Sequence, residues 1–135
     1  MADPMNVFQV AGRAMSAQLI RMNTTASNLA NVGGTTGSAE TAYKTMKPVF
    51  RTSFDAASGL ATVDVEKIVT AGEAPTKVYD PNNPLADKDG NIFQAAVDES
   101  RELVDMMETA RSYQNNVEVM NTAKQLTIDT LKLGR

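Results

Sequence analysis

The segment Thr24–Gly37, with the sequence TTASNLANVGGTTG, ends the first predicted helix and decides what that helix must face. Gly33 and Gly34 stop the helix, because glycine tolerates the left-handed backbone that closes a helix C-terminus. No Asp, Glu, Lys or Arg occurs between Met22 and Ala39. A helix with one face in water gains solubility from Lys and Glu on that face. This uncharged face is therefore predicted to pack against neighbours, and the alternative is a solvated polar helix that is short of charges.

The helix that this segment ends is predicted to begin at Asp3 and Pro4, with Asp3 as the N-cap and Pro4 at the first helical position. Large apolar residues recur every seven positions along it, as they do on a face that packs against another helix. We call these residues the apolar seam of the helix. The seam consists of Phe8, Met15, Met22 and Leu29, with Ala11, Leu19 and Ala26 beside them.

Residues 35–97 follow a β pattern instead. The segments YKTMKPVFRTSF and LATVDVEKIV are strand-like and are separated by the turn residues 55–59, which predicts a hairpin. Pro48 places the first of these strands at an edge or a bulge. A third short strand is predicted for TKVYD, between two turn-forming clusters. The middle of the chain is thus predicted to be a small β-rich module with long loops.

A second helix is predicted from Asp98 to Leu133, with acidic residues near its start and basic residues near its end, as the helix dipole favours. Its apolar residues recur at spacings of three and four, although Lys124 and Thr127 interrupt the pattern. A helix this long needs a partner, and the first helix is the obvious one. The expected fold is mainly α with a small β-rich insert, its two long terminal helices paired as an antiparallel or coiled-coil hairpin. The second seam consists of Leu103, Met106, Ala110, Tyr113, Val117, Met120, Ile128 and Leu131.

The composition argues against several classes of function. The chain has 135 residues, a formal net charge of −3, and neither Cys nor His. It lacks a basic surface for nucleic acid, the usual general base and the usual zinc ligands. The N-terminus lacks the pattern of a cleavable signal peptide, and no segment is apolar enough to span a membrane. General secretion signals alone would place the protein in the cytoplasm.

Two polar clusters are candidate sites. The segment LADKDGN resembles part of a calcium loop, but aligning Gly90 with the invariant glycine puts Leu85 and Ala96 where carboxylates are required. A plain turn is the better interpretation. The acidic residues 98–105 at the start of the second helix are explained by the helix dipole. We therefore expect no enzyme activity, no cofactor, no metal site and no small-molecule substrate.

Three stretches resemble the bacterial flagellar axial proteins, and together they cover nearly the whole chain. ASNLANVGGTTG is similar to the ANNLAN-type motif near the N-terminus of that family, although VGGTTGSAETAYK replaces the usual Thr-Pro-Gly-Tyr turn. The other two stretches are VYDPNNPLADKDGNIFQ in the middle and RSYQNNVEVMNTAKQLTIDTLKLGR at the end. The replaced turn is similar to that of proximal rod subunits within the family.

The resemblance implies a structural subunit of the proximal rod of the flagellar basal body. Such subunits assemble with themselves and with other rod proteins into a helical tube, which transmits motor torque to the hook and filament. The tube connects the membrane ring and export-gate base to the distal rod, and its subunits reach the periplasm by type III export without cleavage. Residues 1–34 and 98–135 would then form the inner coiled-coil domain, and residues 35–97 the outward module.

The resemblance also suggests roles for individual residues. The two apolar seams would hold the helix pair, and amide side chains would make lateral contacts between subunits. The rival interpretation is a soluble helical-hairpin adaptor or secretion chaperone, which should carry charged outer faces on both helices. The expected subunit-contact residues are Asn28, Asn31, Gln114, Asn115, Asn116 and Asn121.

Overall fold

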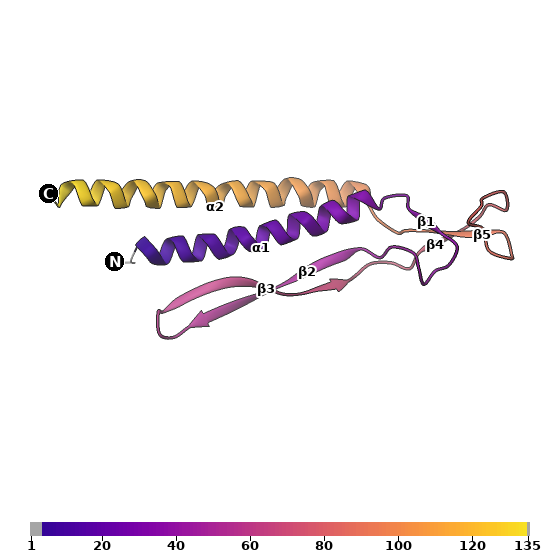
Figure 1. Ribbon diagram of the computed structural model, residues 1–135, viewed down its shortest axis with the longest axis horizontal. Coiled ribbons are helices and arrows are strands. Elements are labelled where there is room, and N and C mark those ends of the chain that lie inside the picture. Colours follow the sequence, from indigo (N-terminus) through magenta and orange to yellow (C-terminus); the bar gives the residue numbers. More distant parts are fainter. Residues whose placement is uncertain (1–3, 135) are drawn as a thin grey trace. The chain divides into compact units, whose positions relative to one another are not determined.

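The computed structural model describes residues 4–134, which form two long helices and an antiparallel β region that lies between them in the sequence (Figure 1). The described residues belong to two compact units. The first unit comprises residues 4–22, 48–67 and 107–134, and the second comprises residues 23–47 and 68–106. Each unit therefore takes a part of both helices and a part of the β region.

Helix α1 runs from Pro4 to Ala30, as the sequence predicts. Pro4 occupies its first position, where the missing N–H group costs nothing. The predicted N-cap, Asp3, lies outside the described residues. After the helix, Gly33 has a φ of 71°, a left-handed conformation that glycine adopts without strain. The predicted stop at the glycine pair is confirmed.

Helix α2 runs from Glu99 to Leu133 and spans 35 residues. The carboxylate of Asp98 accepts a hydrogen bond of 3.1 Å from the backbone N–H of Arg101, which makes Asp98 the N-cap. Glu99 and Glu102 lie in the first turn and Lys132 in the last turn. The charge order along the helix is thus the one that its dipole favours.

Strands β2 (Met46–Asp55) and β3 (Leu60–Thr70) form the predicted hairpin as a two-stranded sheet. Its turn is held by Asp55, whose carboxylate accepts hydrogen bonds from the Ser58 hydroxyl at 2.8 Å and from the Ala57 N–H at 3.0 Å. These bonds lower the pKa of Asp55 from its ordinary value of 3.8, the Ser58 hydroxyl having the larger effect. Both strands are edge strands, which explains why Pro48 is tolerated in β2.

The second unit contains a three-stranded antiparallel sheet in the order β1–β5–β4. Strand β4 (Thr76–Tyr79) corresponds to the strand predicted for TKVYD. Strands β1 (Thr35–Thr36) and β5 (Asn91–Gln94) were not predicted, because they are two and four residues long and lie among turn-forming residues. Between β4 and β5, the Asp87 carboxylate accepts the N–H groups of Asp89 and Asn91 at 2.9 and 2.8 Å. That arrangement confirms the turn interpretation of this segment.

The apolar core is small. Among the described residues, the buried apolar side chains are Ala11, Ala17, Ala42, Ile92, Ala95 and Ala123. Only Ile92 among them is larger than alanine, so the chain buries little apolar surface by itself. Neither helix, over its described residues, has a segment apolar enough to cross a membrane.

Candidate functional site

Three residues of the uncharged segment at the end of α1 are buried within their own chain. Asn28 is only 1% exposed, and Thr24 and Thr25 are also buried. The Asn28 side chain donates to the Met46 carbonyl at 2.9 Å and to the Glu102 carboxylate at 3.0 Å. Its oxygen accepts the Met46 N–H at 2.9 Å and the Tyr43 hydroxyl at 2.7 Å. All four hydrogen-bonding positions of this amide are therefore used within the second unit.

These contacts correct the expectation for Asn28, which was assigned to contacts with other subunits. An amide that is fully buried and fully hydrogen-bonded inside its own chain has no free group to offer a neighbour. The packed interpretation of the uncharged face is right for Thr24, Thr25 and Asn28, but the packing partner is intramolecular. A charged side chain at one of these three positions would be buried without a partner, which explains why they are uncharged.

Small side chains occupy the buried face of α1 throughout. Ala11 and Ala17 are buried in the first unit, and Thr24, Thr25 and Asn28 in the second. We call these five residues the small-residue face of α1. At 3.6 residues per turn, Ala11 lies beside the apolar seam, and the centre of the other four residues lies roughly a third of a turn away from it. The seam residues Phe8, Met15, Met22 and Leu29 are only half-buried, and Leu19 and Ala26 are exposed.

The buried face of α2 is also shifted from its predicted seam. Glu102, Thr109 and Ala123 are buried, and Asn116, which completes this series at seven-residue spacing, is half-buried. The series stands one residue before Leu103, Ala110, Val117 and Lys124. In this register Lys124 is exposed, which accounts for the apparent interruption of the seam.

The predicted seam residues of α2 differ in burial. Leu103 and Leu131 are 47% and 68% exposed. The other six are half-buried: Met106, Ala110, Tyr113, Val117, Met120 and Ile128.

The remaining predicted subunit-contact residues lie nearer the surface. Asn31 and Asn116 are half-buried, and their amide groups donate to backbone carbonyls four residues earlier in the chain, those of Ser27 and Ser112. The side chains of Gln114, Asn115 and Asn121 are exposed on α2. The six predicted residues are divided between the units: Asn28 and Asn31 belong to the second, and the four on α2 belong to the first.

The two helices contact each other in both units. In the first unit, an ion pair of 3.7 Å joins Arg21 of α1 to Glu108 of α2. In the second unit, Asn28 of α1 donates to Glu102 of α2. The hairpin also contacts α1, because Arg13 pairs with the Asp64 carboxylate at 3.0 Å. Helix α1 thus has both α2 and the hairpin as neighbours. Close packing on more than one side favours small side chains on its buried positions.

An apolar groove lies between these elements in the first unit. Its volume is about 310 Å³, and no charged residue lines it. The lining side chains come from α1, from the first residue of β3 and from the middle of α2. They are Asn6, Val7, Val10, Ala11, Ala14, Leu60, Asn116 and Val119.

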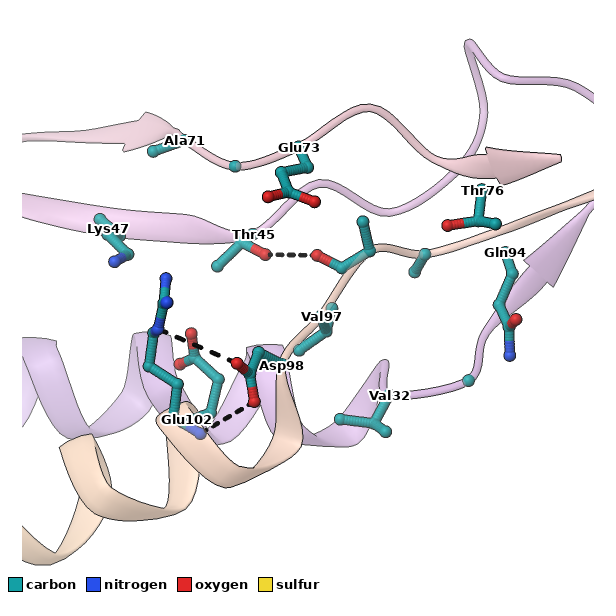
Figure 2. Close-up of a pocket in the computed structure, with 15 residues that line it drawn as sticks. Val32, Thr45, Lys47, Ala71, Glu73, Thr76, Gln94, Val97, Asp98 and Glu102 are labelled. Carbon is teal, nitrogen blue, oxygen red and sulfur yellow. Dashed lines mark hydrogen bonds and ion pairs between the residues drawn. The ribbon is translucent and has the colours of Figure 1, made fainter.

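A polar cavity of about 550 Å³ lies in the second unit (Figure 2). Lys47, Glu73, Asp98, Arg101 and Glu102 supply its charged groups. Asp98 is engaged as the N-cap of α2, and Glu102 accepts the Asn28 amide. Of the acidic residues at the start of α2, Glu102 thus has a packing role in addition to the dipole effect. Among the described residues, no group of three or more His, Cys, Asp or Glu side chains is arranged to hold a metal ion.

Large apolar side chains remain exposed along both helices and the hairpin. On α2 they include Val104, Met107, Val119, Leu126 and Leu133, the last being 87% exposed. Phe50, Phe54 and Ile68 are exposed on the hairpin. A chain that buries alanine and exposes leucine and phenylalanine has its larger apolar surfaces available for partners.

Comparison with known proteins identifies the family. Residues 8–37 match the family model described as flagella basal body rod protein, and residues 89–133 match flagellar basal body rod FlgEFG protein C-terminal. The chain is 44% identical over 133 residues to flagellar basal-body rod protein FlgC of Salmonella typhimurium, with 97% of this chain and 98% of that protein covered. The chain belongs to the FlgC family of flagellar basal-body rod proteins.

Further FlgC relatives match along nearly the same length. The protein of Yersinia enterocolitica is 39% identical over 131 residues, covering 97% of this chain and 98% of the relative. That of Buchnera aphidicola subsp. Acyrthosiphon pisum is 37% identical over 132 residues, covering 96% and 97%. The resemblance to flagellar axial proteins that the sequence motifs indicated is confirmed.

The two family-model matches fall on particular elements of the FlgC-family chain. The first covers most of α1 together with β1, and the second covers β5 and α2. These segments carry the small-residue face of α1 and the buried series of α2, which sequence reasoning missed. The repeat of Thr109, Asn116 and Ala123 at seven-residue spacing was the available signal, because residues at heptad spacing lie on one face of a helix.

Proposed function

We propose that this chain is a structural subunit of the flagellar basal-body rod and that it assembles with further copies and other rod proteins into a helical tube. The proposal rests on membership of the FlgC family, whose relatives are rod proteins and not enzymes. In the proximal rod, the tube would transmit motor torque toward the hook and filament.

One structural observation carries the proposal. The buried apolar side chains among the described residues are five alanines and one isoleucine, whereas much larger apolar side chains are exposed. Exposed apolar surface of this kind marks sites of protein association. A self-contained adaptor with the same helices would place its larger apolar side chains inside and charges outside. The observation therefore favours a subunit whose burial is completed by its neighbours.

The same features suggest how the subunit is organised in the rod. Residues 1–34 and 98–135 would form the inner domain, with α1 and α2 as an antiparallel coiled-coil hairpin, and residues 35–97 would form the outward module. The helix-to-helix contacts in each unit support this arrangement. The half-buried residues of the two apolar seams would then gain further burial from neighbouring subunits, and Asn31, Gln114, Asn115, Asn116 and Asn121 would make lateral contacts.

The partners and the route follow from the same assignment. Neighbours would be further copies, other rod subunits, the membrane-ring and export-gate base, and the distal rod. The subunit would be exported through the flagellar type III apparatus without cleavage and assembled in the periplasm. Mass spectrometry of the chain recovered from basal bodies would test this, because an uncleaved subunit keeps the N-terminus with which it is synthesised.

Complementation tests the function itself. In a strain of the source bacterium that lacks this gene, the chain should restore swimming and should be present in purified basal bodies. Restored swimming without the chain in basal bodies would favour an adaptor or chaperone. Neither swimming nor incorporation would contradict the rod assignment. The control variant is Lys124→Gln, which changes an exposed residue of α2. It is expected to behave as wild type in swimming and in incorporation.

A further inference from the structure

The helix α2 extends past the start of α1 in the first unit (Figure 1). Arg21 pairs with Glu108, and Val10 lines the same groove as Val119. Each step back along α1 therefore corresponds to a step forward along α2, which places Pro4 opposite residue ~125 at equal helical rise. The last turns of α2, from Leu126 to Leu133, have no α1 residue of the described chain opposite them.

This overhang carries an exposed apolar stripe. Leu126 is 62% exposed and Leu133 is 87% exposed, and they follow Val119 at seven-residue spacing on one face of α2. Val119 itself lines the apolar groove between α1 and α2. The exposed stripe is therefore continuous with the groove, and the groove is continuous with the helix-to-helix interface inside the chain.

The groove and the overhang have matching chemistry. Val7, Val10, Leu60 and Val119 give the groove an apolar lining without charges, so a charged partner would lose its hydration there without gaining a counter-charge. A third helix can pack into the groove between two helices when it presents apolar side chains at heptad spacing. Leu126 and Leu133 present that pattern, and they follow the last α2 residue that lines the groove, Val119, without lining the groove themselves.

We propose that the C-terminal overhang of one copy, through Leu126 and Leu133, docks into the α1–α2 groove of a second copy of this chain. Made in one direction only, this contact is heterologous and leaves one groove and one overhang free at the two ends of the pair. Successive copies are thereby added in one direction. The inference rests on the proposed rod function and names the surfaces through which copies of this chain meet.

Disulfide cross-linking tests this contact directly, because the chain contains no native cysteine. The double variant Val10→Cys/Leu133→Cys places one thiol in the groove and one on the overhang. Within one chain, residue 133 lies about 20 Å along α2 from Val119, the groove neighbour of Val10. Disulfides need Cα atoms about 4.4–6.8 Å apart, so only an intermolecular bond can form. The matched control is Val10→Cys/Lys132→Cys, whose second thiol points roughly 100° away around the helix.

The variants are expressed in cells that lack the native gene, and purified basal bodies are oxidised and separated without reductant. We expect dimers and a ladder of higher multimers of this chain, at least tenfold more abundant than in the control. Incorporation without cross-linking, equal cross-linking in the control, or dimers alone would overturn the inference and leave the rod assignment intact. If even the unmodified chain is absent from basal bodies, both the docking contact and the rod assignment are wrong.

A second variant covers the case in which the cysteine pair fails to assemble. Leu133→Glu should reduce incorporation at least tenfold, whereas Lys132→Glu should incorporate normally. Normal incorporation of Leu133→Glu would overturn the inference. If the cysteine pair fails to incorporate while its Lys132 control assembles, that loss supports the same contact.

Discussion

Asn28 is the residue on which the second unit depends most. Its amide joins α1 to the start of β2, to Tyr43 and to the first turn of α2 through four hydrogen bonds. Glu102 is 3% exposed, so the Asn28 amide also satisfies part of a buried carboxylate. Removing such an amide leaves several buried partners unsatisfied at once, including one that carries charge.

Asn28→Ala should therefore lower the free energy of unfolding by about 2–4 kcal/mol. Urea unfolding of the purified chain, followed by circular dichroism, measures this change. Asn121→Ala removes an exposed amide of the same size and should change stability by less than about 0.5 kcal/mol. Equal effects of the two substitutions would show that the hydrogen-bond cluster contributes nothing specific.

The turn of the hairpin depends on Asp55 and should respond to pH. Because its pKa is lowered by the Ser58 hydroxyl and the Ala57 N–H, the carboxylate stabilises the folded turn above its ordinary pKa of 3.8. That contribution is lost as the pH falls through the lowered pKa. A carboxyl NMR titration should place Asp55 below ordinary aspartate, and Ser58→Ala should return it toward 3.8. An unchanged titration in Ser58→Ala would exclude the hydroxyl as the main cause.

At the scale of elements, the two helices and the hairpin could be predicted from sequence, because each has a long periodic pattern bounded by turn residues. The bounds of α1 and α2 agree closely with the patterns at Pro4, Gly33 and Asp98. The small sheet could not be predicted in full. Its strands β1 and β5 are stabilised by pairing with each other, a contact between residues far apart in sequence.

The buried faces of the two helices could not be predicted from hydrophobicity alone either. A hydrophobic period identifies the largest apolar residues, but Ala17, Thr109 and Ala123 are buried because they are small. Size-limited packing and hydrophobic packing can occupy different faces of one helix. The half-buried seam then lies beside the buried face. The residues that the sequence assigns to the helix pair are therefore beside the residues that are buried.

Two glycines in or near α1 give opposite predictions. Gly12 lies inside the helix with open space around its missing Cβ, so Gly12→Ala should stabilise the helix by about 0.5–1 kcal/mol. Gly33 lies after the helix with a φ of 71°, so Gly33→Ala should cost about 1–2 kcal/mol from left-handed strain. Thermal unfolding of both variants measures the difference. A gain in stability for both would contradict the left-handed stop.

At the scale of the whole molecule, the small core limits what the chain can hold together before assembly. Isolated helices with few buried apolar contacts open readily, and regions with low local contact exchange their amide protons fastest. The family and the order of two terminal helices with a β region between them could be recognised from the sequence. The division into two units could not, because the first unit combines three separate stretches of the chain and the second combines two.

Hydrogen exchange on the purified chain should reveal this directly. Amides of residues 127–133 should exchange at near random-coil rates, whereas those around Asn28 and Thr109 should be the better protected parts of the helices. In purified basal bodies, residues 127–133 should become protected at least tenfold. Strong protection of this segment in the monomer would show that it is covered without a second copy.

The small buried side chains of the two helices have a consequence for how this sequence can vary. At Ala17, Thr109 and Ala123 the constraint is volume: a larger side chain at these buried positions would overpack its surroundings. Leu126 and Leu133 are exposed and are proposed to become buried in a second copy, so their side chains must be easy to dehydrate. Apolar side chains of several sizes are tolerable there, but a charged side chain is not. A deep mutational scan read out by swimming should separate these positions into two classes, one ordered by side-chain size and the other by transfer free energy.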